Sequence, residues 1–420
     1  MSVNDFLHDV WSEFNEHMKR YRENGDLPFP SLTNDVHPMF RIDRWVTGKG
    51  QNIRDLYENM RPALQLASLW LTEDAPLLWF SRLTFGNIYV NSTGQSYIAR
   101  NSCIEIDSQH ALEIVKANLH EFGKVNCFMF APHSYKGSQW GTTYSRKECL
   151  PYFEEFSNRD FPAVLSKEGR SSTCISLARG FARFFRMSTA VSERECCRGC
   201  FMFATVIVHE IVHGYYMFIK GVCDEPLWDQ NEKHAELGFS WEATILGHIP
   251  MPSDNDASVN GQFHEISAMQ LREYPANADY ERIMRRLKSG SHAEFTTRDA
   301  KGNHRVWPVL SGGEFRGAKW ALGNDAQLFV ASIHVIPLSW IVAWFRKDTW
   351  ARLKTWWSNA KMYRYPYLGN SFMIIYERTP DGVRVHRPLC EDDPVDAEIL
   401  KERRNLRRSS RSLRKHSQKE

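Results

Sequence analysis

The clearest hydrophobic pattern in the chain is the long apolar stretch at residues 201–219, within a helix predicted at 193–220. It contains FMFATVIV, then HEIVH, and then a second short apolar stretch. An apolar run of this length predicts a buried helix rather than a strand. His209, Glu210 and His213 lie near its centre. Because ionisable groups at that depth are costly in lipid, the pattern excludes an ordinary membrane span.

Weaker patterns predict a mostly helical chain with short strands. Apolar residues at helical spacing predict helices near residues 4–23, 52–72, 108–122, 145–157, 180–190, 231–247, 280–290 and 338–357. Pro62 is expected to break the helix at 52–72. Short apolar or alternating stretches predict strands near residues 125–131, 171–179, 263–271, 292–299, 304–310 and 328–336. We therefore expect a predominantly helical α+β fold.

The chain is long enough to bury a large core and to contain several structural regions. It has 420 residues, of which 42% are hydrophobic. We expect a mostly helical N-terminal region at 1–110, a core around the long apolar helix at 111–250, an α+β region at 251–390 that closes the cleft, and a disordered basic tail at 391–420. Because no long linker follows residue 110, the N-terminal region is expected to form a wall of the same cleft.

The net charge of +3 is concentrated at the C-terminal end. Residues 401–420 contain nine Lys or Arg and two Glu, a net of +7, which leaves −4 on the other 400 residues. The body therefore lacks the basic bias that nucleic-acid binding needs. High charge density and few aromatic residues predict a tail that is disordered or folds only on binding. The tail is either a solvated extension or a contact for an acidic partner or for nuclear import.

The N-terminal end and the cysteines favour an intracellular location, cytoplasmic or, through the basic tail, nuclear. Residues 1–20 have charges throughout and lack the apolar segment of a secretory signal. We expect most of the nine cysteines to be reduced thiols. Cys197 and Cys200 form a lone CxxC. It could hold a metal or a redox disulfide, but ordinary thiols are the favoured interpretation.

The HEIVH segment has the spacing of a metal site. His209 and His213 are four residues apart, about 400° of helical rotation, so both imidazoles leave one face of the helix. Glu210 lies about 100° from His209, where it can reach a water on a shared metal but is poorly placed to bind the metal. This is the HExxH arrangement, in which two histidines bind Zn²⁺ and the glutamate is the general base. The alternative, a buried helix with two satisfied histidines, would bury three ionisable groups without a partner.

A third ligand must come from elsewhere, because catalytic zinc usually has three protein ligands and one position for water. The extended metzincin pattern HExxHxxGxxH is excluded, since Tyr216 and Ile219 occupy its Gly and last His positions. The remaining class takes a glutamate from a second helix some 20 or more residues later. The predicted helix at 232–246 is placed to supply it.

Several side chains of that second helix are candidates. We favour Glu236 as the zinc ligand, with Glu242 second and His234 third. Gly238 and Ser240 are small and would allow the two helices to approach closely. A nearby acidic group that does not bind the metal could instead orient a ligand histidine, and Asp224 and Glu225 are further candidates for that role.

His209-Glu210-x-x-His213 followed by Glu236 resembles the zincin metallopeptidases, specifically their gluzincin branch, and is also similar to zincin-like proteins of fungi. The resemblance covers about 45 of the 420 residues. It implies a zincin-like catalytic core with a small mixed sheet and an HExxH active-site helix, and a Zn²⁺-bound water activated by Glu210. Thermolysin-like enzymes show NExxSD where this chain has HAELGFSWE. In metallopeptidases the strand position of 171–179 is often the sheet edge to which an extended substrate adds, although an ordinary core strand is an equal alternative.

These expectations describe a zinc-dependent hydrolase, most simply a metallopeptidase. Its partner would be a peptide or small-molecule substrate. Two other functions fit the same helix: a zincin-fold enzyme acting on a non-peptide small molecule of secondary metabolism, and a zincin-scaffold protein that binds a partner without catalysis. Glu210 argues against the last, because a structural zinc site needs no carboxylate beside the metal. An oxyanion donor is also required, and nothing in the sequence chooses among His264, Tyr274 and Tyr280.

Overall fold

The computed structural model describes most of the chain. The described residues are 30–47, 53–101, 103–137, 139–162, 172–187, 190–230, 232, 235–252, 257–263, 266–273, 281, 284–285, 287–295, 301–302, 329–361, 363–366, 368, 373–379, 382–389, 391 and 394–416. The predicted helix at 4–23 and strand at 304–310 lie outside them, as does part of the predicted helix at 280–290.

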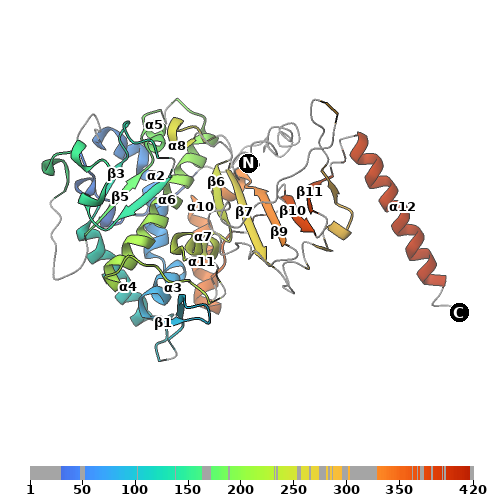
Figure 1. Cartoon of the computed structure of the whole chain (residues 1–420), viewed down its shortest axis with the longest axis horizontal. Coiled ribbons are helices and arrows are strands. Elements are labelled where there is room, and N and C mark those ends of the chain that lie inside the picture. Colours follow the sequence, from blue (N-terminus) through green and yellow to red (C-terminus); the bar gives the residue numbers. More distant parts are fainter. Residues whose placement is uncertain are drawn as a thin grey trace.

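The fold is predominantly helical α+β, as the sequence predicts (Figure 1). The α-helices are α2 (Ile53–Thr72), α3 (Asp74–Phe85), α4 (Gln109–Val125), α5 (Arg179–Met187), α6 (Glu193–Lys220), α7 (Leu237–Ile245), α8 (Ala257–Asn260), α10 (Leu338–Trp344), α11 (Lys347–Ala360) and α12 (Pro394–His416). Short 3-10 turns are η1 (Pro38–Phe40), η2 (Ile42–Arg44), η3 (Lys147–Cys149), η4 (Phe153–Glu155) and η5 (Asn158–Asp160).

The described strands form three sheets. The strands are β1 (Asn87–Val90), β2 (Ser96–Ala99), β3 (Asn126–Phe130), β4 (Gly141–Tyr144), β5 (Thr173–Leu177), β6 (Ile249–Pro252), β7 (Ile266–Glu273), β8 (His292–Glu294), β9 (Phe329–Val335), β10 (Met373–Thr379) and β11 (Gly382–Pro388). A mixed sheet has the order β3-β5-β4, with β3 parallel and β4 antiparallel to β5. An antiparallel sheet has the order β6-β7-β9-β10-β11-β8, and β1 and β2 form a hairpin.

The long helix α6 runs through the centre of the helical part of the molecule. It begins after Ser192, whose hydroxyl accepts the Glu195 N–H at 3.2 Å, and ends at Gly221, which adopts a left-handed conformation with φ 74°. By length and composition alone α6 could cross a membrane, but 83% of its most apolar stretch is buried inside the protein. Its apolar side chains therefore have a partner in the core.

One hydrophobic core joins α6 to helices from both ends of the described chain. It extends from Met39 to Leu368 and includes buried residues of α2, α3, α4, α5, α7, α10 and α11. At its centre Trp70, Trp241 and Trp344 pack edge to face, with ring centroids 5.5 Å apart in both pairs that share Trp70. The residues before 110 and the helices after 337 thus share the core of the long helix, whereas the six-stranded sheet lies to one side (Figure 1).

Several predicted helices differ from the structure. Pro62 lies inside α2 without ending it, because buried residues on both sides of the proline pack into the same core. The predicted helix at 338–357 is two helices, α10 and α11, with a break at Phe345 and Arg346. Residues 145–157 form only the short turns η3 and η4, since Pro151 cannot donate a helical hydrogen bond and disfavours helix in the residue before it.

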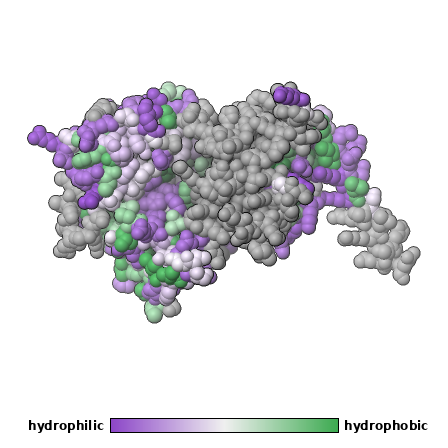
Figure 2. Space-filling model, in the orientation of Figure 1, coloured by the Kyte–Doolittle hydropathy of each residue, from purple (hydrophilic) through white to green (hydrophobic). Residues whose placement is uncertain are grey.

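The prediction of a disordered tail differs from the structure, where residues 394–416 form α12. Pro394 is the first helical residue, and Asp396 is fully buried in a two-bond ion pair with Arg387 of β11. Arg403 donates to the carbonyls of Gly290 and His292 at 3.0 and 2.8 Å. These contacts fix the start of the helix, which then extends away from the sheet (Figure 1). Its surface is mainly hydrophilic in Figure 2, whereas the β1–β2 hairpin exposes hydrophobic side chains.

Candidate metal centre

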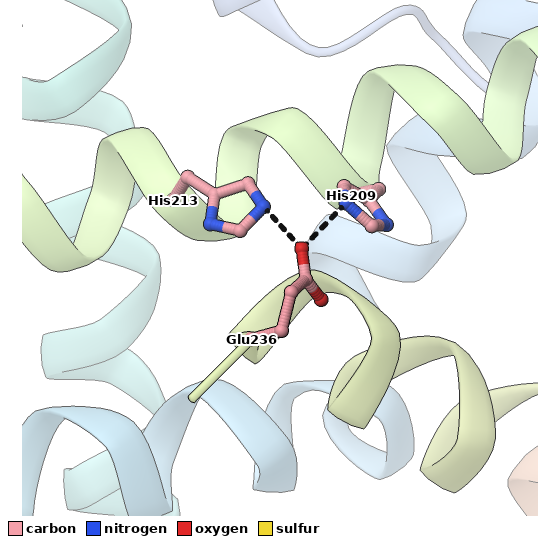
Figure 3. Close-up of side chains that lie close together, drawn as sticks. All are labelled: His209, His213 and Glu236. Atoms are coloured by element: carbon pink, nitrogen blue, oxygen red, sulfur yellow. Dashed lines mark ion pairs between the residues drawn. The ribbon is translucent and has the colours of Figure 1, made fainter. Parts of the chain in front are cut away.

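The helix α6 brings the two histidines of the HExxH segment onto one face. His209 and His213 both point toward the segment that precedes α7 (Figure 3). Their rings have centroids 5.0 Å apart, one turn along the helix. Both side chains are mostly buried, with exposed fractions of 12% for His209 and 16% for His213. The spacing therefore produces the shared face that the sequence predicts.

Glu236 faces these imidazoles from the start of α7. The predicted helix at 231–247 is too long at its beginning, because α7 starts at Leu237 and Glu236 is its N-cap with extended backbone. One carboxylate oxygen, Oε2, accepts the Phe239 N–H at 2.5 Å. Upstream, buried Glu232 accepts hydrogen bonds from Trp228 N and the Ser240 hydroxyl, which holds this part of the chain in a turn. Capping one end of the carboxylate leaves Oε1 directed at the histidines.

The three side chains fit a metal ion. Glu236 Oε1 lies 3.1 Å from His209 Nε2 and 3.0 Å from His213 Nε2, and one atom of each residue lies within 4.8 Å of the others. Tetrahedral zinc with bonds of about 2.0–2.1 Å places neighbouring ligand atoms roughly 3.3 Å apart. Two imidazole nitrogens and one carboxylate oxygen are also a donor set typical of catalytic zinc. No other such group was found in the described part of the chain.

Each histidine is held from behind by a second carboxylate. His209 Nδ1 lies 2.7 Å from Glu242 Oε1, and His213 Nδ1 lies 2.5 Å from Glu225 Oε1. Glu225 Oε2 also accepts the Leu237 N–H at 3.0 Å, which ties it to the start of α7. A carboxylate that accepts the Nδ1 proton fixes the tautomer that presents Nε2 to a metal. Glu242, the second choice as ligand, thus lies behind His209 rather than beside Glu236.

Burial and charge act on the acids and bases of this cluster in opposite directions. Burial disfavours the charged imidazole of His209, but Glu236 and Glu242 together raise its pKa to about 10. The pKa of His213 is raised in the same way by Glu225 and Glu236, against the effect of burial. Burial acts to raise the pKa of Glu236, but His209 and His213 together hold that pKa well below the usual range. Without a metal, the cluster is therefore a network of protonated imidazoles and carboxylates. A metal cation could take the place of the protons between them.

Glu210 lies on a different side of α6, against the edge strand β4. Its Oε2 accepts the Thr143 hydroxyl at 2.7 Å, and Thr143 also donates to its backbone carbonyl at 2.8 Å. A Cβ at Gly141 would lie 2.6 Å from Glu210 Oε1, so a larger residue there would have to displace the carboxylate. Burial raises the pKa of Glu210 although His213, His209 and Thr143 oppose the shift. A buried carboxylate with a raised pKa is a stronger base than an ordinary exposed one, as a group that takes up and returns a proton requires.

The strand at 171–179 is not the edge of its sheet. The structure places β5 between β3 and β4, so the expectation of an edge strand is wrong and the alternative of a core strand holds. All five residues of β5 are buried. The edge on the side of Glu210 is β4, a GTTY segment that the hydrophobic pattern did not predict as a strand because it has only one large apolar residue.

The structure brings together His209, His213 and Glu236, and it adds Thr143 and Gly141, which sequence reasoning missed. These two residues precede Glu210 by more than 60 positions, and no local signal links them to it. His234, His264, Tyr274 and Tyr280 lie outside the described residues. Asp224 is exposed, and its backbone carbonyl accepts the Tyr216 hydroxyl at 3.0 Å.

No protein-family model, curated protein or solved structure matches this chain. An assignment of function therefore rests on the fold and on the cluster of His209, His213 and Glu236.

Proposed function

We propose that this protein is a zinc-dependent hydrolase, a metallopeptidase of the zincin type and its gluzincin branch. The observation that carries the proposal is that two different kinds of acidic site lie around α6, a ligand cluster and a separate buried carboxylate. Three side chains converge on one point, while Glu210, adjacent in sequence to His209, is held apart from them by Thr143. A purely structural metal site has no use for that additional buried carboxylate.

His209, His213 and Glu236 would hold the metal. Bound zinc supplies a Lewis acid that lowers the pKa of a water and polarises a carbonyl. Glu210 is the general base: Thr143 occupies its Oε2, which leaves Oε1 to accept a proton from the attacking water. The same carboxyl group then delivers the proton to the leaving amine. Glu225 and Glu242 keep the two imidazoles in the ligand tautomer throughout.

The position of β4 favours a peptide as substrate over a small molecule. Glu210 contacts both Gly141 and Thr143, and these residues belong to a strand that has one paired neighbour, β5, in the described sheet. An extended peptide can add to the free edge of such a strand through main-chain hydrogen bonds. This would place a peptide bond beside the carboxylate of Glu210.

Metal analysis and a base substitution test the proposal together. Purified protein should contain about one zinc per chain, and His209→Ala should contain none. Glu210→Gln should keep its zinc, because Glu210 is not a ligand, but lose at least about a hundredfold in peptide cleavage, which is the usual scale for a general base. Cleavage is measured by mass spectrometry on a peptide library. Equal zinc in His209→Ala, or full cleavage by Glu210→Gln, would reject the proposal.

A further inference from the structure

A basic pocket is lined by residues that take no part in the proposed metal centre. Its volume is about 410 Å³, and it is lined by the loop after β3 and by α5, which begins just after β5. None of the histidines or glutamates of the metal centre lines it. The pocket thus lies outside the carboxyl ends of two parallel strands, the position where sheets of this kind commonly bind ligands.

Three arginines of α5 line this pocket. Arg179, Arg183 and Arg186 are spaced by four and three residues, so they share one face of a helix of nine residues. Arg183 and Arg186 are exposed and Arg179 is partly buried. Like charges at this spacing repel one another, and an anion bound between them would relieve that repulsion. Glu155 is the one acidic residue among the lining residues, so the lining carries a net charge of +2 with His133 neutral.

The guanidinium groups of Arg179 and Arg183 retain donors for a ligand. Arg179 donates to the His133 carbonyl at 3.0 Å, and Arg183 donates to the Val259 carbonyl at 3.3 Å. Neither lies within ion-pair distance of a carboxylate in the part of the chain that the structure describes. A guanidinium has five N–H donors, so one carbonyl leaves most of them unused.

The loop after β3 forms the opposite wall, and the start of α5 supplies further donors. His133 and Ser134 line the pocket from this loop, and the Ser134 hydroxyl donates its proton to Glu155. The helix α5 begins at Arg179, so the positive end of its dipole lies at the pocket. Arginine forks match the paired oxygens of phosphate groups. The volume is in the range of sites for small molecules.

We propose that this pocket binds a multivalent phosphate group, carried by a small phosphorylated molecule. The ligand's oxygens would bridge Arg183 and Arg186 and reach the donors of Arg179 and the α5 end. The proposal does not depend on the metal or on hydrolysis. It gives the positive charges of Arg179, Arg183 and Arg186 a role in binding.

Calorimetric titration with pyrophosphate tests this site, at constant ionic strength so that screening does not imitate binding. Saturable binding of about one equivalent is expected. Arg183→Ala with Arg186→Ala should weaken it at least about tenfold, because two charge-assisted contacts are lost. Both side chains are exposed, so the double variant should keep its melting temperature. The matched control, Arg352→Ala with Arg384→Ala, removes two exposed arginines from α11 and β11 and should bind as the parent does.

A second arm separates this pocket from the metal centre, since pyrophosphate also binds metal ions. In His209→Ala the titration should be unchanged. Absence of saturable binding, equal affinity in the two double variants, or loss of binding only in His209→Ala would each overturn the proposal. These outcomes leave the hydrolase proposal untouched, because its tests use zinc content and peptide cleavage.

Discussion

Two glycines show how closely side chains approach at the metal centre. A Cβ at Gly238 would lie 2.4 Å from His209 Nε2, and one at Gly141 would lie 2.6 Å from Glu210 Oε1. Neither glycine has a positive φ, so alanine is tolerated by the backbone and the substitution tests space alone. The two positions therefore probe ligand geometry and base geometry separately.

Gly238→Ala should weaken zinc binding by about tenfold or more, because the methyl group pushes His209 away from Glu236 and misplaces a ligand. Gly141→Ala should keep zinc affinity and lose peptide cleavage, since it displaces the carboxylate of Glu210. Affinity is measured by competition with a chromogenic chelator. The same loss of zinc in both variants would contradict the separation of ligand and base.

The carboxylates behind the histidines should differ in importance. Glu225→Gln removes the charge beside His213 and disturbs the hydrogen bond to Leu237 N, whereas Glu242→Gln affects His209 alone. Glu242 Oε2 is also buried without a hydrogen-bond partner among the described residues. Zinc affinity should fall by about 10–100-fold for Glu225→Gln and by less for Glu242→Gln. The reverse order in a chelator competition would show that α7 is not held through Glu225.

His37 should make the protein sensitive to mild acid. Burial, helped by nearby His120, lowers its pKa from 6.5 to about 4, and its Nδ1 accepts the Met39 N–H. The unfolded chain then binds more protons than the folded one between these values. Stability is complete above pH 6.5 and falls by roughly 3 kcal/mol as the pH drops through 6.5 to 4. Urea unfolding of parent and His37→Gln at pH 7.5 and 4.5 checks this, and an equal acid loss in both would assign it to other groups.

At the scale of elements, the sequence predicts what local periodicity determines. Helix α6 matches its prediction from Glu193 to Lys220, because it contains a long apolar run and is flanked by an N-cap serine and a terminal glycine. Glu236 was the favoured ligand on the assumption of a helical position, yet it reaches the histidines as an N-cap. Strand β4 depends on pairing with β5 some 30 residues later, so neither it nor the role of Thr143 could be predicted locally.

Helix α12 should depend on one buried ion pair. Arg387→Ala would leave Asp396 as a buried charge without its guanidinium, a change that typically costs about 3–5 kcal/mol. The tail should then detach, and trypsin should cleave at Lys401 and Arg403 at least about tenfold faster, as the opening free energy falls. The control is Arg404→Ala, which removes an exposed pair with Glu391 of little energetic value. Unchanged cleavage in Arg387→Ala would mean that other contacts hold the helix.

At the scale of the whole molecule, the candidate metal centre lies within one continuous core. Helix α6 carries the histidines, and α7 follows the third ligand; both contribute buried residues to the core that also contains α2 and α10. The regions expected at 1–110 and 251–390 therefore both support the site through packing with α6. Removing the metal should lower the stability of that common core rather than loosen a single loop.

Chelation should lower the melting temperature without unfolding the protein. The fold should persist because Glu236 remains paired with His209 and His213, whose raised pKa values keep them protonated near neutral pH. Zinc at a thousand times its dissociation constant adds about 4 kcal/mol. With an unfolding entropy of about 2 cal/mol/K per residue, this corresponds to roughly 5 °C for a chain of 420 residues.

Scanning calorimetry with and without a chelator measures this shift, and His213→Ala is the control that should not respond. A loss of all cooperative unfolding would make the metal a folding requirement, as in small zinc domains that lack a core of their own. Equal melting temperatures would mean that the cluster binds no metal. A shift of several degrees with a retained transition is what a preformed site in a large core predicts, because packing around α6, and not the ion, holds the ligands in place.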